Sequence, residues 1–248
     1  MRNLRPRPQL PAATIRRLQD KTALVTGKAT AKEKCEEARR LFDQSRTTQW
    51  FKEVVSALQA LAGGADLCMY CSANESSHID HYRPLKTFPE LSFDYHNFLW
   101  ACDICNRRYK GDKFPPDTEP GAQILNPVDD NVWDYFFIEE TFGQLVPRID
   151  PQTKDYYDRA KSTVEVVGLD REQLRLRRVR RYEELRNRGA NALRGINEGH
   201  LTLEDARALV MRWRTDPFQA DVTDYFLKGP GREKELFQEL LGSIGALA

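Results

Sequence analysis

Cysteine, histidine, long apolar runs and an excess of charge of one sign are all scarce in this sequence. Among 248 residues there are 5 cysteines and 4 histidines, and 38 basic residues nearly balance 37 acidic ones. No apolar run approaches the roughly 18 to 20 residues of a membrane-spanning helix, and residues 1–10 lack the apolar core of a secretory signal. We therefore expect a cytoplasmic protein with no membrane partner. The balanced charge gives no whole-chain argument for a polyanionic ligand.

The cysteines are unevenly distributed along the chain. Four of them form two Cys-x-x-Cys pairs, Cys68 with Cys71 and Cys102 with Cys105, whereas Cys35 lies alone in a stretch of helical periodicity. An odd total does not make a complete disulfide set, and four thiolates are the ligands of a tetrahedral structural zinc. The interval between the pairs exceeds the usual spacing of roughly 15 to 20 residues, so the ion would join the two ends of an insertion. We predict structural zinc at these four cysteines, and we expect Cys35 to be buried as a small hydrophobic residue.

The insertion contains the tetrad His78-Ile79-Asp80-His81. Asp80 offers a hard oxygen ligand to a divalent ion such as Mg²⁺ or Mn²⁺. On a strand, neighbouring residues face opposite sides, so His81 would not share that ion and would accept a proton from the attacking water. An imidazole with a pKa of about 6.5 suits this role at neutral pH. His78 would share the face of Asp80, and either approaches the ion or hydrogen-bonds the loop.

The second cysteine pair continues into Asn106-Arg107-Arg108-Tyr109-Lys110-Gly111. In a helix that begins here, Asn106 and Lys110 lie four residues apart on one face. The carbonyl oxygen of Asn106 can be the second protein ligand of the catalytic ion, while Lys110 and Arg107 can neutralise phosphate charge. For Lys110 and Arg108 a solvated helix face is the alternative.

Together these motifs resemble the HNH, or ββα-metal, endonuclease superfamily. The resemblance covers about residues 66–115 and is carried by the two Cys-x-x-Cys pairs and by Asp80, His81, Pro84, Asn97 and Asn106. It implies that Asp80 and Asn106 bind the catalytic ion, that His81 is the general base, and that Asn97 orients the His81 loop by hydrogen bonding. Asn106 stands at the last position of the motif in place of histidine. Tyr109 lengthens the usual Asn-x-x-Lys spacing by one residue, which leaves the role of Lys110 open.

A wider pattern is similar to a narrower group, the PtuB-like HNH nucleases of the Septu and retron antiphage systems. It is carried by the strings His78-Ile-Asp-His-Tyr-Arg-Pro, Pro89-Glu-Leu, Lys110-Gly-Asp-Lys-Phe-Pro and Ile124-Leu-Asn-Pro, and it reaches to about residue 188. This resemblance implies the effector nuclease of a bacterial antiphage defence system. It also implies a partner ATPase of the ABC or SMC-like type, which residue chemistry by itself does not suggest.

Helical periodicity flanks the cysteine-rich segment on both sides. We expect helices at residues 13–20, 31–43, 47–62, 156–167, 170–188, 205–213 and 232–244. Apolar stretches at 133–138 and 144–146 around a glycine-containing turn predict a hairpin. The expected fold is α+β and predominantly helical, with a zinc-anchored ββα-metal module embedded between helical regions. The expected division is an N-terminal helical region, the module, a bracing hairpin segment and a C-terminal helical region, at residues 1–65, 66–116, 117–150 and 151–248.

The expected helix at 171–188 is locally basic, because its arginines outnumber its glutamates. An apolar stripe that includes Leu174 and Leu185 can dock on the body and leave guanidinium groups outward. Such groups would contact nucleic-acid phosphates or an acidic partner protein, or would simply be solvated. The candidate contact residues are Arg107, Arg175, Arg178 and Arg181.

Three functions fit this sequence. The first is a metal-dependent endonuclease that hydrolyses phosphodiester bonds of nucleic acid, with DNA favoured. The second is cleavage of RNA, including tRNA, because a site that contacts a phosphate and a sugar does not by itself distinguish a 2′-hydroxyl. The third is a non-catalytic, zinc-stabilised module that binds nucleic acid or an ATPase. The presence of the complete set Asp80, His81, Asn97 and Asn106 argues against the third.

Overall fold

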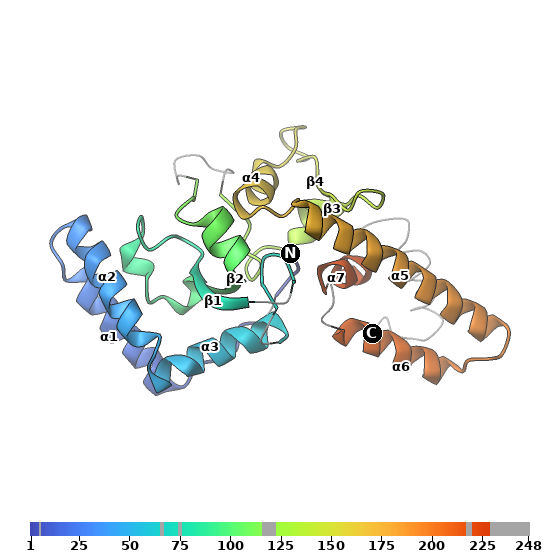
Figure 1. The fold of residues 1–248 in the computed structure, drawn as a ribbon, viewed down its shortest axis with the longest axis horizontal. Helices are drawn as coiled ribbons and strands as arrows, with labels where there is room; N and C mark the ends of the chain where they lie inside the picture. The colour runs from blue at the N-terminus through green and yellow to red at the C-terminus, as the bar shows by residue number, and fades with distance from the viewer. Residues whose placement is uncertain (5, 65–66, 74–75, 116–122, 217–219, 229–248) are drawn as a thin grey trace.

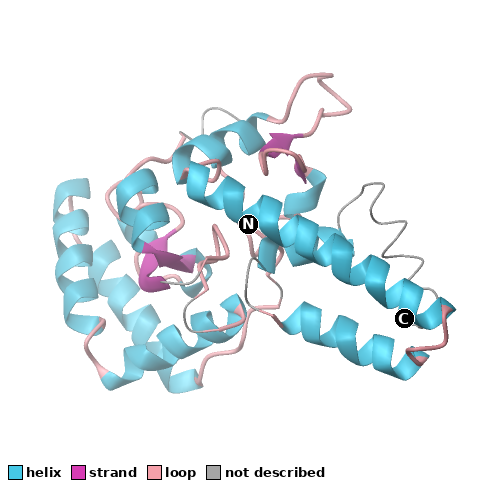
Figure 2. Ribbon diagram, turned by 45° about the vertical axis from the view of Figure 1, so that its right-hand side comes forward, coloured by secondary structure: helices cyan, strands magenta, loops and turns pink. Residues whose placement is uncertain are grey.

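The computed structural model describes residues 1–4, 6–64, 67–73, 76–115, 123–216 and 220–228. It is an α+β protein in which helices dominate and the described strands form two separate two-stranded sheets (Figure 2). Figure 1 shows the N-terminal helices on one side of the first sheet, and helices α5 (Glu172–Asn197), α6 (Leu203–Thr215) and α7 (Ala220–Lys228) on the opposite side of the molecule.

The N-terminal helices are α1 (Ala12–Thr26), α2 (Ala31–Ser45) and α3 (Gln49–Ala62). Thr30 and Glu33 form a capping box at the start of α2, which satisfies two backbone donors of its first turn. Gly63 ends α3 in the left-handed conformation, with φ of 81°. Helix α1 extends six residues beyond the predicted end at residue 20, because Lys21–Thr26 contains no helix-breaking residue and buries Val25.

The first sheet leads directly into a short helix. Strand β1 (Ser76–His81) pairs antiparallel with β2 (Phe98–Cys102), so that His81 lies opposite Phe98. The connection contains the 3₁₀ turns η1 (Pro89–Leu91) and η2 (Tyr95–Asn97), and β2 continues into η3 (Ile104–Lys110), a π-helix. Helix α3 packs on β2, and the later helix α4 packs on η3. The strand, strand and helix are thus held from both sides.

The second sheet is a hairpin at the position that the sequence indicates. After the 3₁₀ turn η4 (Val132–Asp134), strands β3 (Phe136–Ile138) and β4 (Leu145–Pro147) pair antiparallel. Gly143 in the turn has φ of 67°, and a Cβ there would lie 2.2 Å from the carbonyl oxygen of Arg175. The turn therefore requires glycine both for its backbone conformation and for close contact with α5.

The C-terminal helices are α4 (Asp158–Val167), α5 (Glu172–Asn197), α6 (Leu203–Thr215) and α7 (Ala220–Lys228). Gly168 ends α4 in the left-handed conformation, as the sequence predicts. Helix α5 runs nine residues beyond the predicted end at 188, because Gly189 is tolerated inside it and buried against the protein. Helix α7 was not predicted. The helix expected at 232–244 lies outside the described residues.

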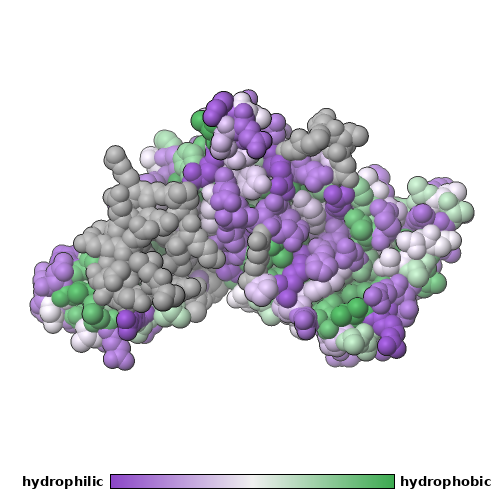
Figure 3. All heavy atoms as spheres, turned by 180° about the vertical axis from the view of Figure 1, so that it is seen from behind, coloured by the Kyte–Doolittle hydropathy of each residue, from purple (hydrophilic) through white to green (hydrophobic). Residues whose placement is uncertain are grey.

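The face opposite to that of Figure 1 carries mainly polar residues where the structure describes it. On this face hydrophilic residues predominate among those described, and hydrophobic residues appear in separate groups (Figure 3). No helix in the described part of the chain has the length and apolar character needed to pass through a bilayer.

Candidate functional site

The four paired cysteines converge into one buried cluster. Their sulfur atoms all lie within 4.8 Å of one another, and the Sγ atoms of Cys71 and Cys102 are 3.8 Å apart. A tetrahedral zinc with Zn–S bonds of about 2.3 Å separates its sulfur ligands by about 3.8 Å. Cys68 and Cys71 precede β1, Cys102 ends β2, and Cys105 lies in η3. The donor set and spacing fit a structural zinc that ties the two strands to the helix.

The surroundings of the cluster also suit bound thiolates. The backbone N–H of Cys105 lies 3.4 Å from the sulfur of Cys102, and the Arg171 guanidinium lies 3.5 Å from the sulfur of Cys105. Burial raises the pKa of Cys68 well above its ordinary value, whereas hydrogen bonding with Cys102 lowers the pKa of Cys71. Four thiolates in this space therefore need a cation, because burying unpaired charge is costly.

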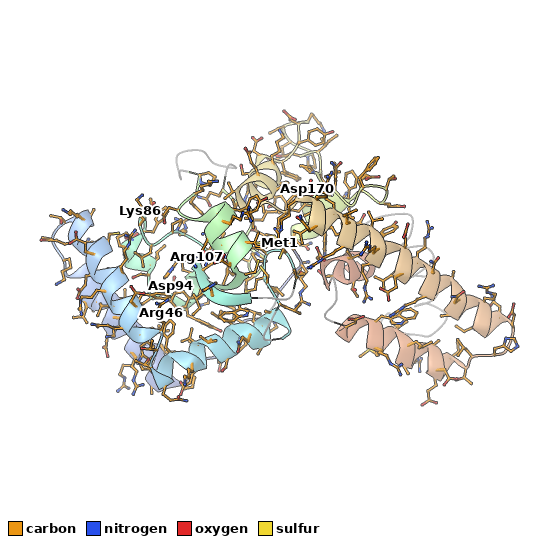
Figure 4. The ribbon with its side chains drawn as sticks, viewed as in Figure 1. Met1, Arg46, Lys86, Asp94, Arg107 and Asp170 are labelled. Atoms are coloured by element: carbon orange, nitrogen blue, oxygen red, sulfur yellow. The ribbon has the colours of Figure 1, made fainter. Side chains whose placement is uncertain are left out.

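An open pocket brings together four of the predicted site residues. Asp80, His81 and Asn106 line this pocket, which has a volume of about 320 Å³ and is also lined by Arg107. The first two come from the end of β1 and the others from η3; Figure 4 labels Arg107 on that helix. Although Asp80 and His81 are neighbours on a strand, both reach the pocket, because it surrounds the point where β1 ends and the chain turns toward Pro84. We refer to it below as the Asp80 pocket.

The Asp80 carboxylate is buried and already has two partners. Its Oδ2 accepts a hydrogen bond of 2.6 Å from the Tyr70 hydroxyl, and its Oδ1 accepts one of 3.0 Å from Lys110 Nζ. Burial beside this carboxylate raises the pKa of Tyr70 well above its ordinary value, so the phenol remains a donor. Tyr70 was not recognised from the sequence. Its position inside the first Cys-x-x-Cys pair is the signal that could have identified it, because zinc fixes that turn beside β1.

The prediction that Lys110 lies on a surface facing the phosphate is wrong, because the structure buries this side chain. Lys110 is 0% exposed, and besides Asp80 its ammonium contacts the backbone oxygen of His81 at 2.7 Å. An ammonium buried beside a carboxylate is stable because each neutralises the other, and the π-helix places this side chain inward. Lys110 therefore compensates the charge of Asp80.

Replacing Lys110 with methionine is expected to destabilise the protein by about 3–5 kcal/mol, because the Asp80 carboxylate would remain buried without a cation. The free energy of unfolding in urea measures this. Lys113→Met is the matched control, since Lys113 is exposed in the same segment. Asp80→Asn combined with Lys110→Met should recover part of the loss. Equal stability of the two lysine variants would show that the ion pair contributes nothing.

The His81 ring is half-buried, and its environment specifies which nitrogen carries the proton. Its Nε2 lies 2.9 Å from the backbone oxygen of Ser92, and the ring packs against Phe42 and Phe98 at centroid distances of 4.7 and 5.3 Å. A carbonyl only accepts, so Nε2 carries the hydrogen and Nδ1 of the neutral ring keeps its lone pair. Burial lowers the pKa of His81, an effect that the Ser92 and Asp80 contacts oppose in part. The neutral form is favoured at pH 7.

Asn97 is buried and bonded to the loop that follows His81. Its Oδ1 accepts from the Arg83 backbone N–H at 2.8 Å, and its Nδ2 donates to the backbone oxygens of Arg83 and Leu91 at 3.0 and 3.1 Å. The backbone oxygen of Asn97 also accepts from the N–H of Tyr82. One side chain thus joins two parts of the β1–β2 connection around His81.

His78 lies apart from the predicted metal ligands. Its Nε2 is 3.6 Å from Oδ1 of Asp103, and it is not among the residues that line the Asp80 pocket. The register of β1 is regular from His78 to Asp80, since its irregularity lies earlier, between Ser76 and His78, so sharing a strand face is not enough to bring His78 into the pocket. The expectation that His78 approaches the ion is therefore not met by this geometry.

Two of the predicted contact arginines face inward. Arg178 and Arg181 are both 0% exposed, and their guanidinium groups pair with carboxylates, among them Asp221 and Asp216. The prediction that they contact a ligand is therefore wrong, and both are structural residues. The apolar stripe of α5 docks more deeply than the sequence suggests, so these two arginines are buried together with it. Arg175 is half-buried, and Arg107 is exposed and pairs with Asp103.

No family model matches the sequence. The chain is similar to the Septu protein PtuB of Bacillus mycoides (strain KBAB4), with 24% identity over 159 residues that cover 52% of this chain and 52% of that protein. The chain thus spans about half the length of this curated relative. The similarity and the four-cysteine cluster are consistent with a PtuB-like protein.

Proposed function

We propose that this protein is a metal-dependent endonuclease of the HNH type that hydrolyses phosphodiester bonds of nucleic acid, with DNA as the favoured substrate. The observation that carries the proposal is the Asp80 pocket, in which the Asp80 carboxylate, the His81 imidazole and the Asn106 amide share one open space. The order of strand, strand and helix around the cysteine cluster supports it, because two of these elements supply the pocket's polar side chains.

Asp80 and Asn106 are the residues that would hold the catalytic divalent ion, Mg²⁺ or Mn²⁺. They fit it because a carboxylate has about four lone-pair sites, and the two hydrogen bonds to Asp80 leave acceptor capacity for a cation. An ion bound there would stabilise the negative charge of the leaving oxygen. Mg²⁺ usually takes only one or two protein oxygens and keeps several waters, which suits an open pocket.

The chain itself supplies the proton acceptor and its alignment. Nδ1 of His81 takes the proton of the attacking water, while the Ser92 carbonyl fixes the tautomer by accepting from Nε2. Asn97 holds the loop on which this histidine is presented. Tyr70 and Lys110 hold the Asp80 carboxylate. Arg107 pairs with Asp103 only through an exposed contact, so a substrate phosphate can compete for its guanidinium group.

The similarity to PtuB supports a role in antiphage defence. We include in the proposal an ATPase partner of the ABC or SMC-like type, which would control when the nuclease acts. A purified complex and the isolated chain should then differ in activity while sharing the same Asp80 pocket.

Cleavage of supercoiled plasmid and of structured RNA tests the proposed function. We expect plasmid cleavage with Mg²⁺ or Mn²⁺, none after EDTA, and slower cleavage of RNA. The assay is run with and without the partner ATPase, so that a partner-dependent enzyme is detected. RNA as the faster substrate would reassign the substrate. No cleavage of either nucleic acid in any of these conditions would indicate a binding module.

The pH dependence of cleavage follows from the His81 environment. Because burial lowers the pKa of His81 below 6.5, the base is already unprotonated at pH 7. The single-turnover rate should rise about tenfold per pH unit in the acidic range and level off below pH 6.5. A rate measured from pH 5 to 8 on plasmid checks this. A rate that still rises about tenfold between pH 7 and 8 would be incompatible with His81 acting as this base.

A further inference from the structure

A second pocket lies on the other side of η3, against the first turns of α5. It has a volume of about 340 Å³, and its lining includes three arginines: Arg108 from η3, with Arg171 and Arg177 at the start of α5. No aspartate or glutamate is among the described residues that line it. Figure 4 marks the two elements, with Arg107 labelled on η3 and Asp170 immediately before α5. We call this cavity the arginine pocket.

Two of the three guanidinium groups are available to a ligand. Arg171 is occupied, since it contacts the Cys105 sulfur at 3.5 Å and donates to the Gly168 oxygen at 2.9 Å. Arg108 and Arg177 are exposed, and neither forms an ion pair with an acidic residue of the described chain. Asp170, the adjacent carboxylate in sequence, is turned to Arg178 and to the N–H of Leu145. The pocket therefore presents uncompensated positive charge.

The chemistry of this lining selects a phosphate. Guanidinium groups bind phosphate oxygens through two parallel hydrogen bonds, and arginine cannot lose its charge in this pH range. Two such forks in a concave site with no competing carboxylate suit a dianionic or diester phosphate better than a neutral ligand.

The two pockets share one helix. Asn106 and Arg107 line the Asp80 pocket, whereas the next residues, Arg108 and Tyr109, line the arginine pocket. A helix with its side chains is about 10–12 Å across, and phosphates of one strand advance about 3.4 Å along a duplex. Neighbouring phosphates lie farther apart than this axial rise, because the backbone winds around the duplex axis, so a strand that crosses η3 would place phosphates only a few nucleotides apart in the two pockets. This continuity favours nucleic acid over an acidic protein loop.

We propose that the arginine pocket is a phosphate subsite, in which Arg108 and Arg177 bind the backbone of a nucleic-acid strand a few nucleotides from the phosphate held in the Asp80 pocket. The ligand identity rests on the proposed function, but the binding role does not require cleavage. The subsite contacts backbone only, so it would strengthen binding to any sequence.

Fluorescence anisotropy with a fluorescein-labelled 20-nucleotide probe tests this, using single-stranded DNA, duplex DNA and single-stranded RNA without added divalent ions. Arg108→Gln combined with Arg177→Gln should raise Kd about tenfold on the preferred probe. The slope of log K against log salt should become shallower by about 1 to 2, as expected for two lost phosphate contacts. Arg186→Gln is the matched control, because Arg186 is exposed on the same helix and lies outside the pocket. Its Kd should stay within about twofold of the parent.

The proposal is overturned if the double variant binds as tightly as the parent, or if Arg186→Gln weakens binding equally. It is also overturned if the parent binds none of the three probes, in which case the pocket is free to meet an acidic partner protein. Zinc content and circular dichroism verify that both variants are folded. If the double variant binds weakly but His81→Ala cleaves like the parent, the subsite stands and the proposed catalytic role fails. If the double variant binds like the parent but His81→Ala no longer cleaves, the catalytic role stands and the subsite fails.

Discussion

Replacing His81 with alanine is expected to slow phosphodiester cleavage by about 10²- to 10⁴-fold, the usual contribution of a positioned general base. The loss should fall on the chemical step, because the imidazole is the group in the Asp80 pocket that can accept a proton through Nδ1. Single-turnover cleavage of plasmid at saturating protein measures the effect, and anisotropy with the 20-nucleotide probe should show an almost unchanged Kd.

The matched control for this variant is His96→Ala. His96 is an exposed histidine in the same β1–β2 connection and does not line the Asp80 pocket. Because the His81 ring packs on Phe42 and Phe98, circular dichroism and zinc content have to be measured alongside the rate. If folded His81→Ala cuts plasmid as fast as the parent, another group is the base.

Changing Cys102 to serine is expected to release zinc and unfold the segment around the Asp80 pocket. Structural zinc sites contribute on the order of 10 kcal/mol or more in apparent binding free energy. A two-stranded sheet buries too little apolar surface to supply the same stabilisation once the ion is lost. Cys102 ends β2 immediately before η3, so its loss would free the helix that carries Asn106. Elemental analysis should show zinc well below one equivalent, and limited proteolysis should cut this segment.

Cys35→Ser is the control, because Cys35 lies half-buried on α2 and away from the sulfur cluster. It should keep its zinc and its resistance to protease. One full equivalent of zinc in Cys102→Ser, with an unchanged proteolysis pattern, would refute the structural role of the metal.

Local signals in the sequence account for much of what is observed. Gly63 and Gly168 each end a helix where predicted, because the left-handed conformation that they adopt is readily available only to glycine. The two Cys-x-x-Cys pairs predict a four-sulfur cluster, and the structure confirms that these sulfur atoms meet. Glycine at a helix end and closely spaced cysteine pairs each have few alternative structural roles, so both can be interpreted from the sequence.

Side-chain exposure was harder to predict along the basic segment. Arg178 and Arg181 look like surface residues in a run of arginines, yet they are buried because carboxylates from later in the chain cover them. No sequence pattern within α5 reports those partners. The same run contains Arg177, whose exposure depends only on the side of the helix that docks.

Residue identity and short-range spacing therefore determined most of the helices, the hairpin, the sulfur cluster and the set of groups from which a site could be built. The tertiary structure alone decided which of those groups are free to act. It paired Lys110 with Asp80, held one nitrogen of His81 against Ser92, and turned arginines of α5 inward or outward. The physical reason is that a charge's environment is set by groups distant in sequence, whereas a turn or a metal knuckle is set by its own residues.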